Sequence, residues 1–468
     1  MYSNKYAGCI MIDKDIYLEL GEIVLDNLKY KFNFNMQDSE RWDLVEKTME
    51  RIVRDTGDGR FKQVYDDRPK RKEFIEKFLS YDEVEEFIKS PEVEDIDINS
   101  TGPIFVHITD RGFVKTNKSF YSMRYLDFFQ KKLLIFAGRS YFSKINDYGL
   151  PNIHGRVNIV HSPFGPQITI TKSKTLPLSI IQLIERNMLD YKTAAFLWIA
   201  VEGMNLRPAN MLIVGGPGAG KTTLLNALLS FIPSSDRVII IEDTLELNTK
   251  FMDNFSRLES GEDLSLEHLV KNTLRMRPER IIIGEVRGRE AQDMMTAMNI
   301  GKYCMGTIHA SNTKEAFTRL ENVPMNIHPS LINLVDIFVV LRRFRKGSIV
   351  QRITEEISET SFMHQKRPLV SVIWKYDYKA RRIVEASPFT IFRDKLAEAT
   401  GLDSENILKE MNIRAKLLYL LSNKNIKTFH EITNFASLYS KDKAQAFNSI
   451  GLNEKEVENI SLPTRGSS

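Results

Sequence analysis

The sequence predicts an α/β fold, preceded by a smaller α+β domain and followed by a helical extension. From about residue 186 to residue 321, apolar runs alternate with helical patterns, as a parallel sheet covered by helices requires. Short strand patterns separated by turns occupy residues 91–175. Apolar residues at helical spacing fill residues 390–460, which indicates the helical extension.

Four segments are predicted along the chain. Residues 1–90 are highly charged and mostly helical, with apolar positions at helical spacing between Trp42 and Val53. Residues 91–175 form the α+β domain, residues 176–395 the α/β domain, and residues 396–468 the helical extension with a free tail. The strands expected in the α+β domain lie at 93–98, 104–108, 157–160 and 167–171.

In the α/β domain, a helix follows each strand. The break in pattern at 172–175, before a helix at 178–189, marks the expected linker between domains. The apolar stretch 194–201 reads as a buried helix. Two antiparallel hairpins are expected at 336–357 and 370–384. Strands are expected at 210–215, 237–242, 280–284 and 304–309, and helices at 221–231, 264–276, 288–300 and 312–321.

Composition limits the classes of protein to consider. The 468 residues are 42% hydrophobic and 27% charged, which suits two or three globular domains. The net charge of +4 is too small to argue for a protein that wraps nucleic acid. Cys9 and Cys304 lie too far apart for a close-spaced cysteine metal motif and fit a reducing compartment. With neither a signal-peptide pattern nor a run of about 18 apolar residues, we expect a cytoplasmic protein that meets the inner face of the membrane only peripherally.

The most specific motif joins the first strand of the α/β domain to its first helix. An apolar strand ending at Val214 runs into the sequence Gly215-Gly216-Pro217-Gly218-Ala219-Gly220-Lys221-Thr222-Thr223. The glycines let backbone N–H groups wrap a phosphate, and the helix N-terminus adds positive potential. Lys221 is expected to reach the β- and γ-phosphates, and the Thr222 hydroxyl to hold Mg²⁺. The sequence therefore predicts a nucleotide site for ATP and Mg²⁺; the alternative is a glycine-rich turn without a ligand.

Polar residues end three later strands, where the carboxyl ends of a parallel sheet form a ligand crevice. Glu242 is expected to hold Mg²⁺ through water or to orient the attacking water. Glu285 is favoured as the catalytic acid, because Gly284 stands where the usual second nucleotide motif carries an Asp. His309 is placed to contact the γ-phosphate. The alternatives are acids that cap the following helices and a structural histidine.

Together these motifs resemble those of the type II/type IV secretion-system ATPases, which include pilus-assembly, tight-adherence and archaellum motor ATPases. The resemblance covers roughly residues 90–345. The C-terminal extension of this chain looks most like that of archaeal members of the family. The resemblance implies a RecA-like fold, ATP hydrolysis, a hexameric ring and a polytopic membrane partner. Its elements appear in family order as a Walker A loop at 215–222, an Asp box at 241–246, a Walker B stretch at 274–288 and a His box at 306–311.

The resemblance also implicates arginines of the N-terminal α+β domain, which approach the phosphates in this family. The resemblance implies a catalytic role for Arg156 and a contact with the nucleotide for Arg139. The sequence departs from the family pattern at Thr171, where Arg is frequent, and at Lys302, where His is frequent. These departures put a phosphate contact and a second histidine role in doubt, and they leave His309 intact.

Three functions are compatible with these features. The first is a motor ATPase that assembles a pilus, archaellum or secretion filament. The second is a conjugation-type ATPase that translocates DNA; the low net charge, without a basic stripe interleaved with aromatics, argues against direct contact with nucleic acid. The third is a regulatory scaffold that binds ATP with little turnover; the set Lys221, Thr222, Glu242 and Glu285 argues against it.

Overall fold

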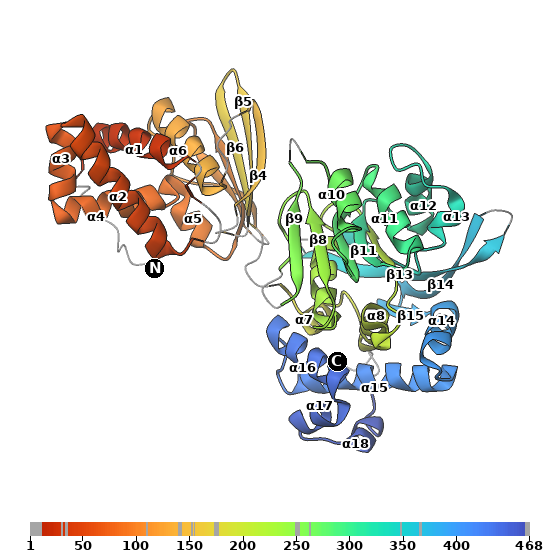
Figure 1. The fold of residues 1–468 in the computed structure, drawn as a ribbon. Helices are drawn as coiled ribbons and strands as arrows, with labels where there is room; N and C mark the ends of the chain where they lie inside the picture. The colour runs from red at the N-terminus through yellow and green to blue at the C-terminus, as the bar shows by residue number, and fades with distance from the viewer. Residues whose placement is uncertain are drawn as a thin grey trace. The chain divides into compact units, whose positions relative to one another are not determined.

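The computed structural model divides the chain into two compact units, Met1–Thr175 and Leu176–Ser468 (Figure 1). Each unit has its own sheet and its own buried apolar residues, so each is described by itself. Among the described helices, none has the length and apolar character needed to cross a lipid bilayer. The structure describes residues 12–29, 31–32, 36–108, 111–138, 143–150, 153, 155–172, 177–248, 253–261, 264–346, 349–364 and 367–463.

The first unit packs helices against an antiparallel sheet with the strand order β3-β2-β1-β6-β5-β4. One hydrophobic core joins the helices of residues 14–89 to this sheet, with the rings of Phe74 and Phe128 packed against Tyr17. The helices are α1 (Lys14–Leu28), α2 (Asp38–Thr56), α3 (Gly59–Asp66), α4 (Arg68–Leu79), α5 (Glu85–Lys89) and α6 (Met123–Phe136). The strands are β1 (Val93–Asn99), β2 (Ile104–Ile108), β3 (Gly112–Lys115), β4 (Ile145–Leu150), β5 (Gly155–Ser162) and β6 (Gly165–Lys172).

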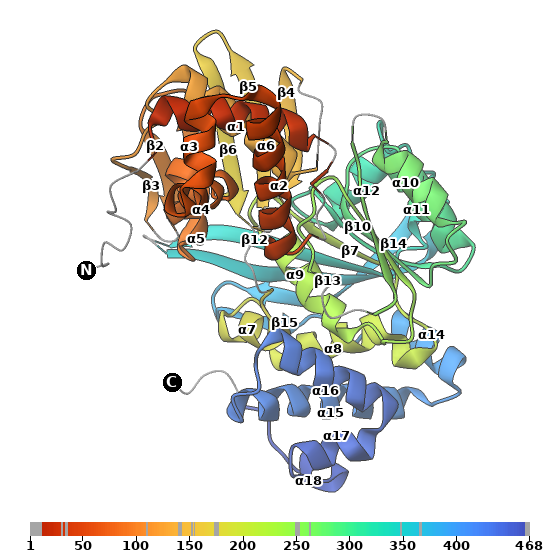
Figure 2. The same ribbon diagram turned by 60° about the vertical axis from the view of Figure 1, so that its left-hand side comes forward.

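The second unit contains a nine-stranded sheet with the order β15-β14-β13-β12-β7-β11-β10-β8-β9 (Figure 2). Strands β9, β8, β10, β11, β7 and β12 run parallel, and β13, β14 and β15 continue the sheet as antiparallel strands. This confirms the predicted α/β class with a RecA-like core. The strands are β7 (Met211–Gly215), β8 (Val238–Glu242), β9 (Phe255–Glu259), β10 (Arg280–Val286), β11 (Tyr303–Ile308), β12 (Ile337–Lys346), β13 (Ile349–His364), β14 (Arg367–Asp377) and β15 (Arg382–Glu385).

Helices cover both faces of this sheet, which explains why its central strands are apolar runs. In β7, Met211 and Ile213 belong to one core, and Leu212 and Val214 belong to the other. The first core also contains residues from the C-terminal helices, so these helices complete the unit from below in Figure 1. The helices are α7 (Ile180–Glu185), α8 (Tyr191–Glu202), α9 (Lys221–Leu228), α10 (Leu266–Thr273), α11 (Glu290–Asn299), α12 (Thr313–Glu321), α13 (Pro329–Ile332), α14 (Ile391–Thr400), α15 (Ser404–Asn423), α16 (Phe429–Lys441), α17 (Lys443–Ser449) and α18 (Glu454–Glu458).

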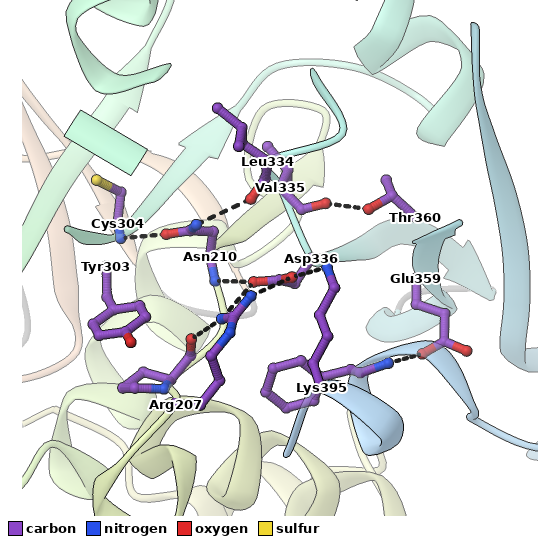
Figure 3. A network of polar contacts seen from close by, with 12 residues as sticks. Arg207, Asn210, Tyr303, Cys304, Leu334, Val335, Asp336, Glu359, Thr360 and Lys395 are labelled. Carbon is purple, nitrogen blue, oxygen red and sulfur yellow. Dashed lines mark hydrogen bonds and ion pairs between the residues drawn. The ribbon is translucent and has the colours of Figure 1, made fainter. Parts of the chain in front are cut away.

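A buried polar network holds the amino ends of three parallel strands together (Figure 3). The Asp336 carboxylate accepts hydrogen bonds from the backbone N–H of Asn210 at 2.9 Å, from Lys395 at 2.6 Å and from Arg207 at 3.3 Å. The Asn210 side chain donates to the Leu334 carbonyl at 3.0 Å and accepts from the Cys304 backbone N–H at 2.8 Å. This network fixes β7, β11 and β12 relative to one another. It thereby also fixes the relative positions of the residues at the carboxyl ends of these strands.

Candidate phosphate-loop site

The phosphate loop lies between β7 and α9, as the motif predicts. Gly218 and Gly220 adopt φ values of +67° and +97°, a left-handed conformation that glycine enters without a side-chain penalty. Lys221 begins α9, and its buried ammonium donates to the Gly216 carbonyl at 3.3 Å. Burial lowers the pKa of Lys221, and Glu285 opposes this change. The loop therefore presents a cation and backbone N–H groups at one edge of the sheet.

Three predicted site residues meet at this edge. His309 directly follows β11, and its Nε2 atom lies 3.3 Å from Lys221 Nζ and 3.4 Å from Glu285 Oε1. Burial and the Lys221 charge lower the pKa of His309, and the Glu285 carboxylate opposes them. Because the ordinary pKa of histidine is about 6.5, this imidazole is neutral at pH 7. The site thus combines an ammonium, a carboxylate and a neutral imidazole.

Glu242 ends β8 as a buried carboxylate with protein partners on both oxygens. Its Oε1 atom accepts hydrogen bonds from the backbone N–H groups of Glu246 and Leu247, both at 2.8 Å, and its Oε2 atom accepts from Arg257 Nε at 2.9 Å. Burial raises the pKa of Glu242, and Arg257 with the two N–H groups opposes this rise. Glu242 therefore holds in place the segment that follows β8, through the N–H groups of Glu246 and Leu247.

Oxygen donors suited to Mg²⁺ are present in this part of the unit. Mg²⁺ is commonly held by one or two protein oxygens together with phosphate oxygens and waters. The Thr222 hydroxyl and the carboxylates of Glu242 and Glu285 have this chemistry. Among the described residues, no group of three or more His, Cys, Asp or Glu side chains forms a metal site by itself. The Mg²⁺ ligation by Thr222 and Glu242 remains a prediction.

The unusual glycine of the second motif has a steric explanation. A Cβ atom at Gly284 would lie 3.1 Å from Glu242 Cγ, closer than ordinary carbon contacts. The Thr307 hydroxyl donates to the Gly284 carbonyl at 2.7 Å and holds β10 against β11. The space that an Asp side chain would need at position 284 is therefore taken by Glu242.

Several basic residues of the site escaped the sequence analysis. Arg257 binds Glu242, and Arg287 forms an ion pair with Asp243, whose carboxylate also accepts from the Ser260 hydroxyl at 2.6 Å. On β13, Arg352 Nε donates to the Gly218 carbonyl at 2.9 Å. Arg342, Arg343 and Arg345 follow the apolar start of β12, and this run of arginines in the sequence indicates a positively charged sheet edge. The sequence around Arg257 and Arg287 gives no comparable indication of their contacts.

Two predicted site residues belong to the first unit. Arg156 lies on β5, and its guanidinium forms an ion pair with Asp147 on β4, with Nε 2.7 Å from Oδ1. Arg139 lies outside the described residues. Lys172, next to the departing Thr171, donates to the Phe87 carbonyl at 3.0 Å within the same unit. The contacts predicted between Arg156, Arg139 and a nucleotide stay predictions.

Comparisons with known proteins agree with these motifs. A family model described as "Type II/IV secretion system protein" matches residues 150–390. An uncharacterized protein of Methanocaldococcus jannaschii is 48% identical over 145 residues, which are 29% of this chain and 20% of that protein. A second uncharacterized protein of the same organism is 29% identical over 364 residues, 74% of this chain and 64% of that protein. This chain therefore spans less than two thirds of either relative.

Among solved structures, the pilus retraction motor PilT with bound ADP is similar at 17% identity and a TM-score of 0.45. That match covers 81% of this chain and 98% of the PilT chain.

Proposed function

This chain belongs to the family of type II/IV secretion system proteins, and from that premise we propose that it is a motor that hydrolyses ATP to assemble a pilus, archaellum or secretion filament. The observation that supports hydrolysis most is the meeting of Lys221, Glu285 and His309 beside the phosphate loop, with His309 Nε2 within 3.4 Å of both partners. A loop that only bound phosphate would not need a carboxylate and a neutral imidazole at its open edge.

In the proposed reaction, Lys221 and the loop N–H groups bind the β- and γ-phosphates. Glu285 orients the attacking water and accepts its proton, because its contact in this cluster is a neutral imidazole that leaves the carboxylate available. Mg²⁺, when bound, supplies positive charge that stabilises the phosphate oxygens. Thr222 and, through water, Glu242 are the residues proposed to hold it.

Glu242 and Glu285 differ in how their charges are used. Both Glu242 oxygens accept hydrogen bonds from Arg257 or from backbone N–H groups, so proton transfer at Glu242 would break existing contacts. Glu285 has no such backbone partners among the described residues. This difference favours Glu285 as the general base and Glu242 as the residue that positions the metal and the loop after β8.

The proposed assembly follows from family membership alone. We propose that six copies form a ring at the cytoplasmic face of the membrane and act on a polytopic membrane protein. Direct contact with nucleic acid is not part of this proposal, because the net charge is only +4. Stimulation of ATP hydrolysis by lipid vesicles, and not by DNA, would support the filament motor over the DNA translocase.

The test of hydrolysis is the substitution Glu285→Gln. We expect ATP binding to persist while kcat falls by about 10²–10⁴-fold, the usual contribution of a general base. Glu398→Gln makes the same chemical change at an exposed position of α14 and should leave kcat unchanged. Turnover of Glu285→Gln at the rate of the unaltered protein would show that Glu285 is not the base.

A further inference from the structure

Exposed apolar side chains gather at one end of the sheet in the first unit. Phe164, in the turn between β5 and β6, is 84% exposed, and Ile145, at the start of the edge strand β4, is 62% exposed. Tyr121 and Met123, on either side of the residue that caps α6, are also exposed. Large apolar side chains that are exposed together mark a contact with another protein or with a membrane.

Three loop segments meet at this end. After β1, the Ser100 N–H donates to the Pro166 carbonyl at 3.0 Å, and a Cβ at Gly165 would lie 2.8 Å from Met123 Cε. The segments are residues 100–103, 119–123 and 162–165; together we call them the tip, and none of their thirteen residues is charged. In Figures 1 and 2, the β5–β6 turn projects beyond the rest of the first unit.

The β5–β6 turn keeps its shape without the Phe164 ring. The Ser162 hydroxyl donates to the Gly165 carbonyl at 3.0 Å and accepts from the Phe164 N–H at 3.1 Å. Gly165 has a φ of +98°, which glycine adopts without a side-chain penalty. Because Ser162 and the backbone fix the turn, the exposed ring adds little to folding and is available for contact.

Lysines lie behind the tip. Lys144 is next to the exposed Ile145, and its carbonyl accepts from the His161 N–H at 3.0 Å, one residue before the tip. Lys115 ends β3 opposite Phe105 on β2, and Thr116, which follows it, pairs with the first residue of β2. In the part of the chain that the structure describes, neither ammonium forms an ion pair.

The acids on the α1 side of the tip are compensated within the protein. Glu22 pairs with Arg124 at 2.8 Å. Asp13 caps α1 by accepting from the Asp15 N–H at 2.9 Å, and the positive N-terminus of this helix offsets both carboxylates. The surface therefore combines an uncharged, aromatic tip with unpaired lysines behind it.

The size and chemistry of the tip favour a lipid bilayer over a protein partner. A stable protein interface takes about 20–30 residues a side, more than the thirteen of the tip. Insertion into a bilayer needs no matching groove; aromatic side chains settle at the level of the headgroups, and lysines attract anionic headgroups. We propose that the tip inserts into a bilayer that contains anionic lipids, with Phe164 deepest and the lysines at the headgroups. The proposal rests on the proposed function for the place of the motor at a membrane, and it requires neither ATP nor a second protein.

The test is cosedimentation of the full chain, without nucleotide, with vesicles of mixed phosphatidylcholine and phosphatidylglycerol. Phe164→Ser should weaken binding by about tenfold or more, because burial of the ring in lipid is lost. Phe113→Ser makes the same change at a 65% exposed position of β3, beside the β2–β3 turn at the other end of the sheet, and should leave binding unchanged. Lys115→Gln combined with Lys144→Gln should weaken binding to these vesicles by about tenfold or more and leave binding to phosphatidylcholine alone unchanged.

Insertion itself is measured with Phe164→Trp, whose indole should be quenched by lipids brominated in their acyl chains. The quenching is compared with that of the unaltered chain, which contains three tryptophans, and with that of Phe113→Trp, which should show no added quenching. An indole at position 164 that the lipid does not quench would overturn the proposal and point to a protein partner. Binding of Phe164→Ser as tight as that of the unaltered chain would also overturn it. Equal losses on both kinds of vesicle in the double lysine variant would refute the place of the lysines at the headgroups.

ATP hydrolysis without vesicles separates this proposal from the proposed function. Phe164→Ser should hydrolyse ATP at the rate of the unaltered chain, because the change is confined to an exposed turn of the first unit. If the unaltered chain bound vesicles through Phe164 but hydrolysed no ATP, the proposed function would fail and the membrane contact would stand. If it hydrolysed ATP but did not bind vesicles, the membrane contact alone would be wrong.

Discussion

Replacing Gly284 with alanine should destabilise the second unit through one crowded contact. The new Cβ would lie 3.1 Å from Glu242 Cγ and 3.6 Å from both Glu242 Cβ and the Ile241 carbonyl oxygen. Glu242 cannot move away freely, because its oxygens are held by Arg257 and two backbone N–H groups. We expect a loss of about 1–2 kcal/mol, which corresponds to a decrease in Tm of about 2–3 °C for a unit of this size.

A double-mutant cycle isolates this contact, with thermal unfolding followed by calorimetry. Glu242→Ala removes Cγ, so adding Gly284→Ala to that background should be neutral or slightly stabilising, since alanine restricts the unfolded chain more than glycine does. Glu242→Gln keeps Cγ and removes the charge, so the cost of Gly284→Ala should persist there. If Gly284→Ala costs the same in the Glu242→Ala background as in the unaltered protein, the steric explanation is refuted.

Three further predictions concern charge. Burial lowers the folded-state pKa of His309, so the unfolded chain binds this proton more readily and stability should fall as pH drops below about 6.5. His309→Gln should remove that part of the pH dependence of the unfolding free energy, and an unchanged slope would contradict it. Arg257→Met removes a charge that lowers the pKa of Glu242, so Glu242 should become protonated at a higher pH in this variant than in the charge-conserving Arg257→Lys. As the pH is lowered, ATP hydrolysis should therefore begin to fall at a higher pH in Arg257→Met. Identical acid limbs in the pH–rate profiles of the two variants would argue against this. Asp336 is 1% exposed between two cations, so Asp336→Asn should cost about 3–5 kcal/mol in denaturant unfolding. Lys395→Met, at a side chain that is 33% exposed, should cost less, and equal costs would show that burial of Asp336 is not the cause.

The sequence predicted the central strands well, because strands buried on both faces are continuous apolar runs, as in 238–242. It did not predict β9 (Phe255–Glu259), an edge strand whose residues are all half-buried and show no alternation. Helix α6 (Met123–Phe136) was also missed: most of its residues are buried, including the polar Gln130 and Lys132, which blur the apolar pattern. The helix expected at 178–189 ends earlier, at Glu185, because Asn187 takes a left-handed conformation.

The candidate site was predictable where its residues end strands. Glu285 and His309 come together because neighbouring parallel strands carry their carboxyl ends to one edge. The arginines that contact Glu242, Asp243 and Gly218 were not predictable, because they reach these residues only through the three-dimensional register of the sheet. For the same reason, nothing in the sequence showed that Glu242 occupies the space beside Gly284.

The core shared with the C-terminal helices has a consequence for synthesis of the protein. Ile213, in the strand before the phosphate loop, belongs to the same core as Val457. A ribosome releases the chain from its amino end, so all residues of the first unit emerge while this core is still incomplete. At about 5–20 residues per second, the roughly 240 residues between these positions take roughly 10–50 s to synthesise. During that interval the core lacks the residues that the C-terminal helices supply, and chaperones in the cell have time to bind its exposed apolar surface.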